Sequence, residues 1–212
     1  MNYTALSQAI QDYCVNSETS FVDNIPTFVG LAEQRIYNTV QIPAIRKNQI
    51  GSLTSTNKYL SLPSDWLATF SLAVIDPVTN AQSFLLDKDV NYIREAFPYP
   101  ATSGQPTHYA QFDATTLILG PTPDASYSVE LHYYYYPQTI VTAGTSWLGT
   151  NFSDVLLYGS IREAYVYLKG EAELIQKYDT MYEEALERLK QLGDGKNRMD
   201  AYRSGQVRVP VR

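Results

Sequence analysis

Few residues of this 212-residue chain are suited to acid–base or nucleophilic chemistry. It has one cysteine, Cys14, and two histidines, His108 and His132, which fall in separate predicted strands. A reactive thiolate or a general base needs a partner within hydrogen-bond reach, and nothing in the spacing of these residues brings such a pair together. We therefore interpret Cys14 as a small buried hydrophobic residue and both histidines as structural.

Other catalytic patterns are also missing from the sequence. Acidic pairs such as Glu171/Glu173 and Glu183/Glu184 lie beside lysine and arginine in predicted helices, which is typical of a solvated helix face. There is no Cys/His metal spacing, no glycine-rich phosphate loop and no serine in a nucleophile elbow. We therefore predict no catalytic residue, no cofactor and no metal, and a chain that is not an enzyme.

Charge is distributed unevenly along the chain. Asp194 to Arg212 carry five basic and two acidic side chains, which leaves −9 on residues 1–193 out of an overall formal charge of −6. Binding to a phosphate backbone needs a basic patch, so this acidic body argues against nucleic-acid readout. An acidic wall is compatible with DNA that passes along it without being held. The basic C-terminal segment is expected to bind something that the body does not.

Targeting signals are not evident either. No run approaches the ~18 apolar residues of a membrane span, and the N-terminus lacks the basic flank and apolar stretch of a signal peptide. We expect that the protein does not contact a membrane and that it acts without being secreted. The glycosylation patterns at Asn2 to Thr4 and Asn151 to Ser153 are therefore interpreted as helix-start chemistry.

The strongest strand pattern runs from Tyr127 to Tyr136, in a chain with 18 tyrosines. Alternate residues from Tyr127 to Tyr135 are apolar or aromatic and predict a buried face. The other face carries Tyr134 and Tyr136 beside His132, and we predict that these two rings contact another protein subunit. For Tyr133 and Tyr135 a core role and an interface role remain equally open.

The region before this strand predicts further β structure. Thr116 to Leu119 and the strand from Tyr127 are expected to form a hairpin across Gly120 to Asp124. Two short strands are expected within Gly51 to Leu62, and a strand pair is expected from Leu67 to Ile75 and Ser83 to Leu86. A short helix is predicted near residues 88–97, where Asp87 precedes an acidic first turn.

Both ends of the sequence have the 3.6-residue periodicity of amphipathic helices. At the N-terminal end we predict a helix over Thr4 to Tyr13 with Thr4 as N-cap, and a second from near Asn24 that ends by Ile42. At the C-terminal end we predict a helix capped by Ser153 and Asp154 that ends at Gly170, followed by one from about Glu171 to Leu192 that Gly193 stops. The second helix is expected to pair Glu184 with Arg188.

These elements predict an α+β fold in which N- and C-terminal helix pairs form one bundle around an inserted antiparallel β-rich region. The expected boundaries are residues 1–45 for the N-terminal helices, 46–145 for the β insertion, 146–193 for the C-terminal helical hairpin and 194–212 for an extended arm. The arm alternates valine with basic residues, a pattern that favours strand addition or groove docking, against plain disorder as the alternative.

Several phrases, taken in order, resemble phage head-to-tail adaptor (connector) proteins of the tail tubular protein A type from short-tailed phages. They are AEQRIY (32–37), KYLSLPSDW (58–66), ILGPTPDA (118–125), ELHYYYYP (130–137), TSWLGTNFSDVLLYGSIREAY (145–165) and LGDGKNRMDAYRSGQ (192–206). Each phrase is weakly specific, but their order and spacing cover nearly the whole chain. The family has no catalytic residues to transfer to this sequence.

The resemblance implies a structural virion protein at the head–tail junction, assembled in the host cytoplasm. It implies a dodecameric ring that joins the portal protein to the tail nozzle protein around the DNA channel. The C-terminal segment would be the portal-binding arm, with contacts expected from Arg198, Tyr202, Arg203, Val207, Arg208, Val209 and Val211. Tyr134 and Tyr136 would contact a neighbouring subunit or the nozzle. The alternative is a glycan-binding module of a tail fibre or tailspike, in which Tyr134 and Tyr136 stack on sugar rings.

Overall fold

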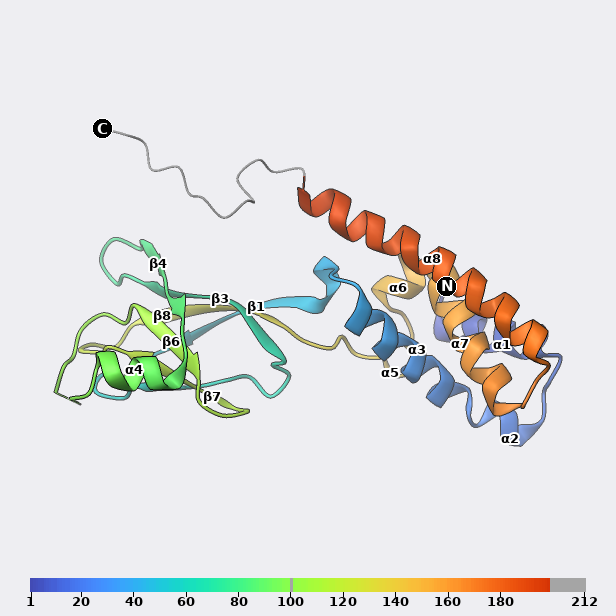
Figure 1. The fold of residues 1–212 in the computed structure, drawn as a ribbon, viewed down its shortest axis with the longest axis horizontal. Helices are drawn as coiled ribbons and strands as arrows, with labels where there is room; N and C mark the ends of the chain where they lie inside the picture. Colours follow the sequence, from blue (N-terminus) through green and yellow to red (C-terminus); the bar gives the residue numbers. More distant parts are fainter. Residues whose placement is uncertain (100, 199–212) are drawn as a thin grey trace. The chain divides into compact units, whose positions relative to one another are not determined.

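The computed structural model describes residues 1–99 and 101–198 and divides the chain into two compact units. Of the described residues, the helical unit holds Met1–Ala44 and Pro137–Arg198, and the β unit holds the rest of Ile45–Tyr136 (Figure 1). The predicted α+β class is confirmed: helices from the two sequence ends pack together, and two four-stranded sheets lie between them in the sequence. Within the described ranges, no helix is both long enough and apolar enough to cross a lipid bilayer.

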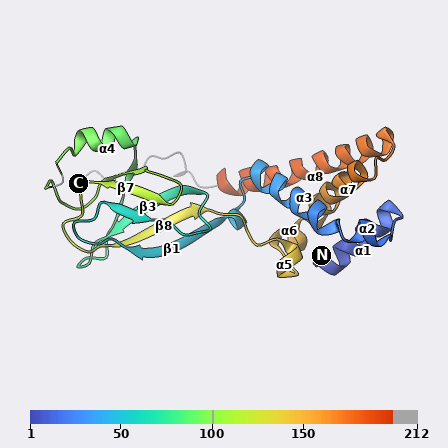
Figure 2. The same cartoon turned by 90° about the horizontal axis from the view of Figure 1, so that it is seen from below.

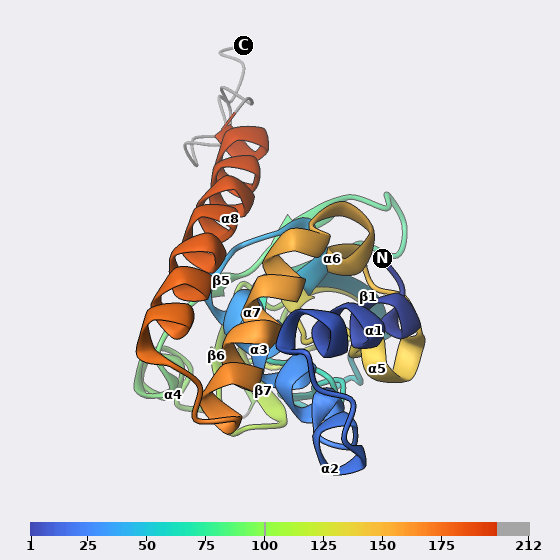
Figure 3. The same ribbon diagram turned by 90° about the vertical axis from the view of Figure 1, so that its right-hand side faces the viewer.

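The helical unit is organised around α7 (Ser153–Tyr167), which contacts helices from both ends of the sequence. Helices α1 (Tyr3–Cys14), α3 (Ile25–Thr39) and α8 (Ala172–Arg198) pack against it (Figure 3). Shorter helices complete the unit: α2 (Thr19–Val22), α5 (Ile140–Ala143) and α6 (Trp147–Asn151). Because α7 has neighbours on several sides, its buried residues are not confined to one stripe.

The two predicted N-terminal helices are present, and α3 buries one face as its periodicity predicted. The stripe of α3 is buried as expected and comprises Ile25, Phe28, Val29, Ala32, Ile36 and Val40. The N-cap of α1 is Asn2 and not Thr4, because the Asn2 side chain accepts a hydrogen bond from the Ala5 N–H at 2.9 Å. Asparagine caps as well as threonine does, so the helix begins before Thr4. The short helix α2, between α1 and α3, was not predicted from the sequence.

Helix α8 is longer than the sequence predicted. We expected it to stop at Gly193, but it continues through two glycines to Arg198. A glycine inside a helix costs only about 0.5–1 kcal/mol relative to alanine, which does not end a helix of 27 residues. Five residues that we assigned to the arm, 194–198, are therefore helical.

The contact between α7 and α8 also differs in two details. The left-handed residue after α7 is Lys169, with φ of 51°, and not Gly170. Arg188 binds Asp154 of α7, with 2.8 Å between Nη2 and Oδ2, and does not form the expected pair with Glu184. The ion pair thus links two helices, where we had expected it within one.

The β unit contains two sheets and the helix α4 (Val90–Ala96). Its strands are β1 (Arg46–Ser52), β2 (Tyr59–Ser61), β3 (Ala68–Ile75), β4 (Gln82–Phe84), β5 (Leu86–Asp87), β6 (His108–Gln111), β7 (Thr116–Gly120) and β8 (Ser128–Tyr134); the 3-10 turn η1 (Pro43–Ile45) precedes them. Sheet A has the order β1-β8-β3-β4, and sheet B has the order β2-β7-β6-β5. Figure 2 shows β8 of sheet A between β1 and β3. The β5–β6 pair is parallel and the other pairs are antiparallel. The predicted β3–β4 pair and the short helix, capped by Asp89, are confirmed.

The hairpin predicted from Thr116 to Pro137 is wrong. Strand β7 lies in sheet B between β2 and β6, whereas β8 lies in sheet A between β1 and β3. Pro121 and Pro123 lack the N–H groups that a continuing ladder needs, and the segment between the strands carries the chain from one sheet to the other. The strands expected within Gly51 to Leu62 likewise belong to different sheets, β1 and β2.

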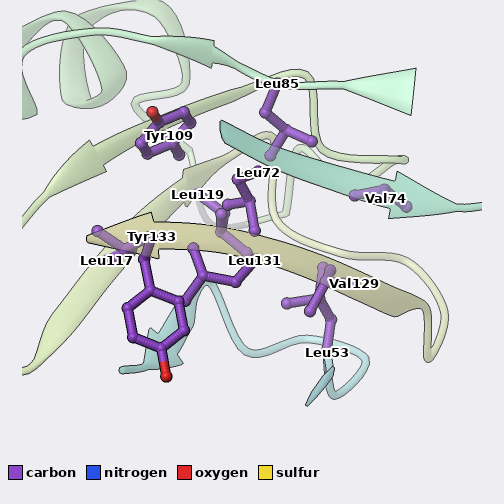
Figure 4. Packing of buried hydrophobic residues seen from close by; sticks show 10 residues of the cluster. All are labelled: Leu53, Leu72, Val74, Leu85, Tyr109, Leu117, Leu119, Val129, Leu131 and Tyr133. Carbon is purple, nitrogen blue, oxygen red and sulfur yellow. The ribbon is translucent and has the colours of Figure 1, made fainter. Parts of the chain in front are cut away.

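The core of the β unit lies between the two sheets (Figure 4). Its buried residues come from strands of both sheets and from the segments that join them: Leu53, Leu72, Val74, Leu85, Tyr109, Leu117, Leu119, Val129, Leu131 and Tyr133. On the other face of sheet B, Ile93 of α4 packs against Ala110 and Ile118. The core therefore buries one face of sheet A. We call the opposite face of this sheet the outer face.

Candidate protein-interaction surface

Alternate residues of β8 point to the outer face of sheet A, as the sequence predicted. Val129, Leu131 and Tyr133 are buried on the core side. Tyr133 has no exposed surface, so of the core role and the interface role left open for it, the core role is correct. On the outer side Tyr134 is half-buried, and Tyr136, just beyond the strand, is 40% exposed.

Tyr134 belongs to a cluster that the sequence did not reveal, formed by Arg46, Phe70, His132 and Tyr134. The Phe70 ring meets His132 and Tyr134 edge-on, with centroid distances of 4.9 and 5.8 Å. The Arg46 guanidinium carbon lies 4.5 Å from the Phe70 centroid and 5.6 Å from the Tyr134 centroid. We call this group the Arg46 cluster.

Strand register explains why these side chains meet. Arg46 of β1 is paired directly with Tyr134 of β8, so both project from the same face. On β3, the register shifts between Thr69 and Ser71, which makes Phe70 the extra residue of a β-bulge. The alternation of a regular strand does not predict where a bulged side chain points, so this signal was not readable from the sequence.

The chemistry of the Arg46 cluster suits protein contact. Phe70 remains 47% exposed, and Nε of Arg46 is buried without a hydrogen-bond partner among the described residues. A guanidinium resting on aromatic rings contributes about 0.5–2 kcal/mol. Arginine and tyrosine are the residue types enriched at the energetic centres of protein interfaces.

On the core side, a polar network holds β8 in place beneath this surface. The Tyr133 hydroxyl donates a hydrogen bond to Oδ1 of Asp65 at 2.9 Å and points away from the aliphatic side chains (Figure 4). Oδ2 of the same carboxylate lies 2.7 Å from Nζ of Lys47. The hydrogen bond from Lys47, together with that from Tyr133, lowers the pKa of Asp65, while burial and the nearby carboxylate raise the pKa of Tyr133.

The expected arm residues fall largely beyond what the structure describes. Arg198 is the last residue of α8. The other expected contacts lie outside the described residues: Tyr202, Arg203, Val207, Arg208, Val209 and Val211. The structure therefore does not test the arm.

The residues considered for chemistry are not assembled into a site. Burial raises the pKa of Cys14 to about 11, which keeps the thiol protonated and unreactive at neutral pH. His108 contacts the rings of Tyr92 and Phe97, and Nδ1 lies 2.8 Å from Thr107 Oγ1. In the part of the chain that is described, no three His, Cys, Asp or Glu residues group as metal ligands.

Further exposed aromatic and apolar side chains were not predicted from the sequence, because they lie on short strands and loops. Tyr59 and Phe112 pack against each other with 5.3 Å between centroids, and Arg94 lies over Phe112. On sheet A, Ile50 and Phe84 are 68% and 65% exposed. A stretch of three alternating residues, such as β4, is too short for its pattern to predict which face it shows.

An α+β chain with a packed helical unit, exposed aromatic surface and a basic C-terminal sequence has the features of a structural protein that binds other subunits. The family model described as SU10 adaptor protein matches residues 1–210, and the chain belongs to this family. It is a phage head–tail adaptor, a structural and non-enzymatic protein of the virion, as the resemblance implied. No curated protein matches the chain.

Proposed function

We propose that the protein assembles as a dodecameric ring beneath the portal and joins the portal protein to the tail nozzle protein around the DNA channel. The observation that carries this proposal is the match of the adaptor family over residues 1–210. An adaptor must bind other virion proteins, and a ring that extends the portal gives each subunit an equivalent contact with it. In this role the protein sits at the head–tail junction after assembly in the host cytoplasm.

The portal contact is assigned to the C-terminal segment 194–212, which begins within the last turns of α8. Five basic and two acidic side chains in residues 194–212 oppose an acidic body, so the arm and the body favour different partners. Because α8 extends to Arg198, the arm starts from a helix end. The proposed contact residues are Arg198, Tyr202, Arg203, Val207, Arg208, Val209 and Val211.

Tyr134 and Tyr136 are proposed to contact a neighbouring subunit or the nozzle. The Arg46 cluster supports this, since its rings are partly exposed and one of its buried donors has no partner among the described residues. The alternative function, a glycan-binding module of a tail fibre or tailspike, is not favoured, because the chain belongs to an adaptor family. In addition, Phe70 and Arg46 already occupy the surroundings of the Tyr134 ring.

Genome DNA is proposed to pass through the ring without specific binding. With −9 on residues 1–193, a channel wall formed by the body would not hold phosphates tightly. Rapid passage requires that contacts with the DNA backbone stay weak.

A binding experiment with the portal ring tests the arm. A chain cut after Arg198 keeps all of α8, so we expect it to fold as the full chain does. We expect the full chain to bind immobilised portal and the 1–198 chain to lose binding at least tenfold. A full-length variant with Arg203, Arg208 and Arg212 changed to glutamine keeps the length of the arm but removes three of its charges, so it separates the effect of charge from that of length. Equal binding by full-length and 1–198 chains would contradict the assignment.

A further inference from the structure

A shallow pocket of about 310 Å³ lies on the outer face of sheet A. Its floor is formed by two small side chains of β3, Ser71 and Ala73. Ala73 is paired with Phe84 of β4 on one side and with Glu130 of β8 on the other. The small Ala73 side chain therefore lies between two larger side chains. The hollow therefore follows from residue size along three adjacent strands. Its volume is at the lower end of the ~300–1,000 Å³ usual for ligand pockets.

The polar part of the pocket is centred on Glu130. One carboxylate oxygen accepts a hydrogen bond from the Asn48 amide of β1, and the other accepts one from the Gln82 amide of β4. The two amides thereby hold the carboxylate from opposite sides. Among the described residues, the amide oxygens of Asn48 and Gln82 have no hydrogen-bond partner, and each NH2 group retains a second donor. Hydrogen-bond donors and acceptors therefore lie next to one another in the pocket.

The apolar part of the pocket is the ring of Phe84. This side chain is 65% exposed and makes no ring contact with another aromatic residue of the described ranges. The imidazole of His132 lines the pocket next to Glu130 and is held by the edge of Phe70. The pocket thus lies toward β4, whereas the Arg46 cluster lies where β1 begins and β8 ends.

We propose that this pocket binds an uncharged sugar residue. A pyranose ring has a C–H face that packs on an aromatic ring, which Phe84 supplies. Its hydroxyls each donate and accept, and the Asn48, Gln82 and Glu130 side chains offer both functions within one small volume. Acidic sugars and phosphate esters are disfavoured, because the Glu130 carboxylate repels a second anion.

A lysine or arginine side chain of a partner protein is the main competing occupant. It would be attracted to Glu130 and could donate to the amide oxygens of Asn48 and Gln82, but it has no acceptor to offer. The remaining amide N–H groups could not pair with a cation, which has no acceptor. A hydroxyl can pair with either partner, so the lining favours a neutral polyol. This inference does not rest on the proposed ring or on the arm.

Saturation-transfer NMR on the full chain tests the pocket with neutral hexoses, N-acetylhexosamines and galacturonic acid. Contacts of one sugar are few, so we expect a dissociation constant of about 1 mM for a neutral sugar. Phe84→Ala and Glu130→Gln should each reduce the signal at least fivefold. Val78→Ala is the matched control, because it removes an 85% exposed apolar side chain from the β3–β4 turn outside the pocket. Circular dichroism verifies that each variant is folded.

Three results would overturn the proposal. The first is no signal for any neutral sugar with the folded wild-type chain, and the second is a signal that neither Phe84→Ala nor Glu130→Gln changes. The third is stronger binding of galacturonic acid than of galactose. Loss of subunit or nozzle binding in Phe84→Ala, without any sugar signal from the wild type, would assign the pocket to a partner's side chain. Because portal binding by the arm is measured separately, either proposal can fail alone.

Discussion

Glu33 is the clearest single test of how the helical unit is held together. Its side chain lies in α3, is 3% exposed, and accepts a hydrogen bond from the Ile140 N–H at 3.0 Å and another from the Thr139 hydroxyl. These bonds fix the start of α5, where the chain returns from the β unit to the helices. Glu33→Ala should therefore weaken the helical unit.

The expected size follows from the groups left without partners. A buried N–H with no acceptor costs about 1–3 kcal/mol, and a hydrogen bond to a charged group contributes about 1.5–3 kcal/mol. Relief of the buried charge offsets part of this loss, so we expect Glu33→Ala to lower the free energy of unfolding by about 2–4 kcal/mol. Thermal unfolding followed by helical circular dichroism should show a midpoint about 5–12 °C lower.

The matched variant Glu33→Gln separates the hydrogen bonds from the charge. Burial raises the pKa of Glu33 above its ordinary 4.5, against the lowering effect of its two hydrogen bonds. From pH 4.5 up to the raised pKa the folded chain binds more protons than the unfolded chain, so wild-type stability falls as the pH rises. Glutamine does not titrate.

The stability of Glu33→Gln relative to wild type should therefore increase with pH across this window and then level off. Melting curves of both proteins at a series of pH values from 4 to 8 measure the difference, which removes the contributions of other groups. A difference that does not change with pH, or a Gln variant as unstable as Glu33→Ala at every pH, would refute the reasoning.

Two further predictions concern a hydrogen bond in the β unit and the space around two glycines, one in each unit. Tyr133→Phe removes the donor to Asp65 but keeps the ring, and should lower the free energy of unfolding by about 1 kcal/mol in urea titrations; an unchanged midpoint would mean that the bond adds nothing. Gly120→Ala would place a Cβ 2.5 Å from Cδ2 of Phe97 and should cost about 1–3 kcal/mol. Gly30→Ala, with nothing within 4 Å of its Cβ, should instead stabilise α3 by about 0.5–1 kcal/mol; equal effects of the two changes would contradict the packing argument.

The sequence predicted the elements better than their connections. The stripe of α3 and the alternation of β8 were predicted because burial follows helix and strand periods directly. The partners of β7 were missed, since two strands close in sequence pair only when the segment between them allows a ladder. The extension of α8 past Gly193 was missed because one glycine costs too little to end a long helix.

The candidate surface was predicted in part. Strand alternation predicted that Tyr134 faces away from the core, but nothing in the sequence indicated that Phe70 and Arg46 would contact it. That contact depends on a bulge in β3 and on the register of β1 with β8, both of which arise from long-range pairing. The pocket at Glu130 likewise combines residues from four strands of sheet A, so no local pattern contains it.

Electron microscopy of the protein mixed with its portal ring tests the central proposal most directly. We predict that negative-stain images show a second ring of twelve subunits stacked coaxially on the portal, and that the 1–198 chain gives bare portal rings. Images in which the full-length protein leaves the portal ring unextended would contradict the adaptor-ring proposal.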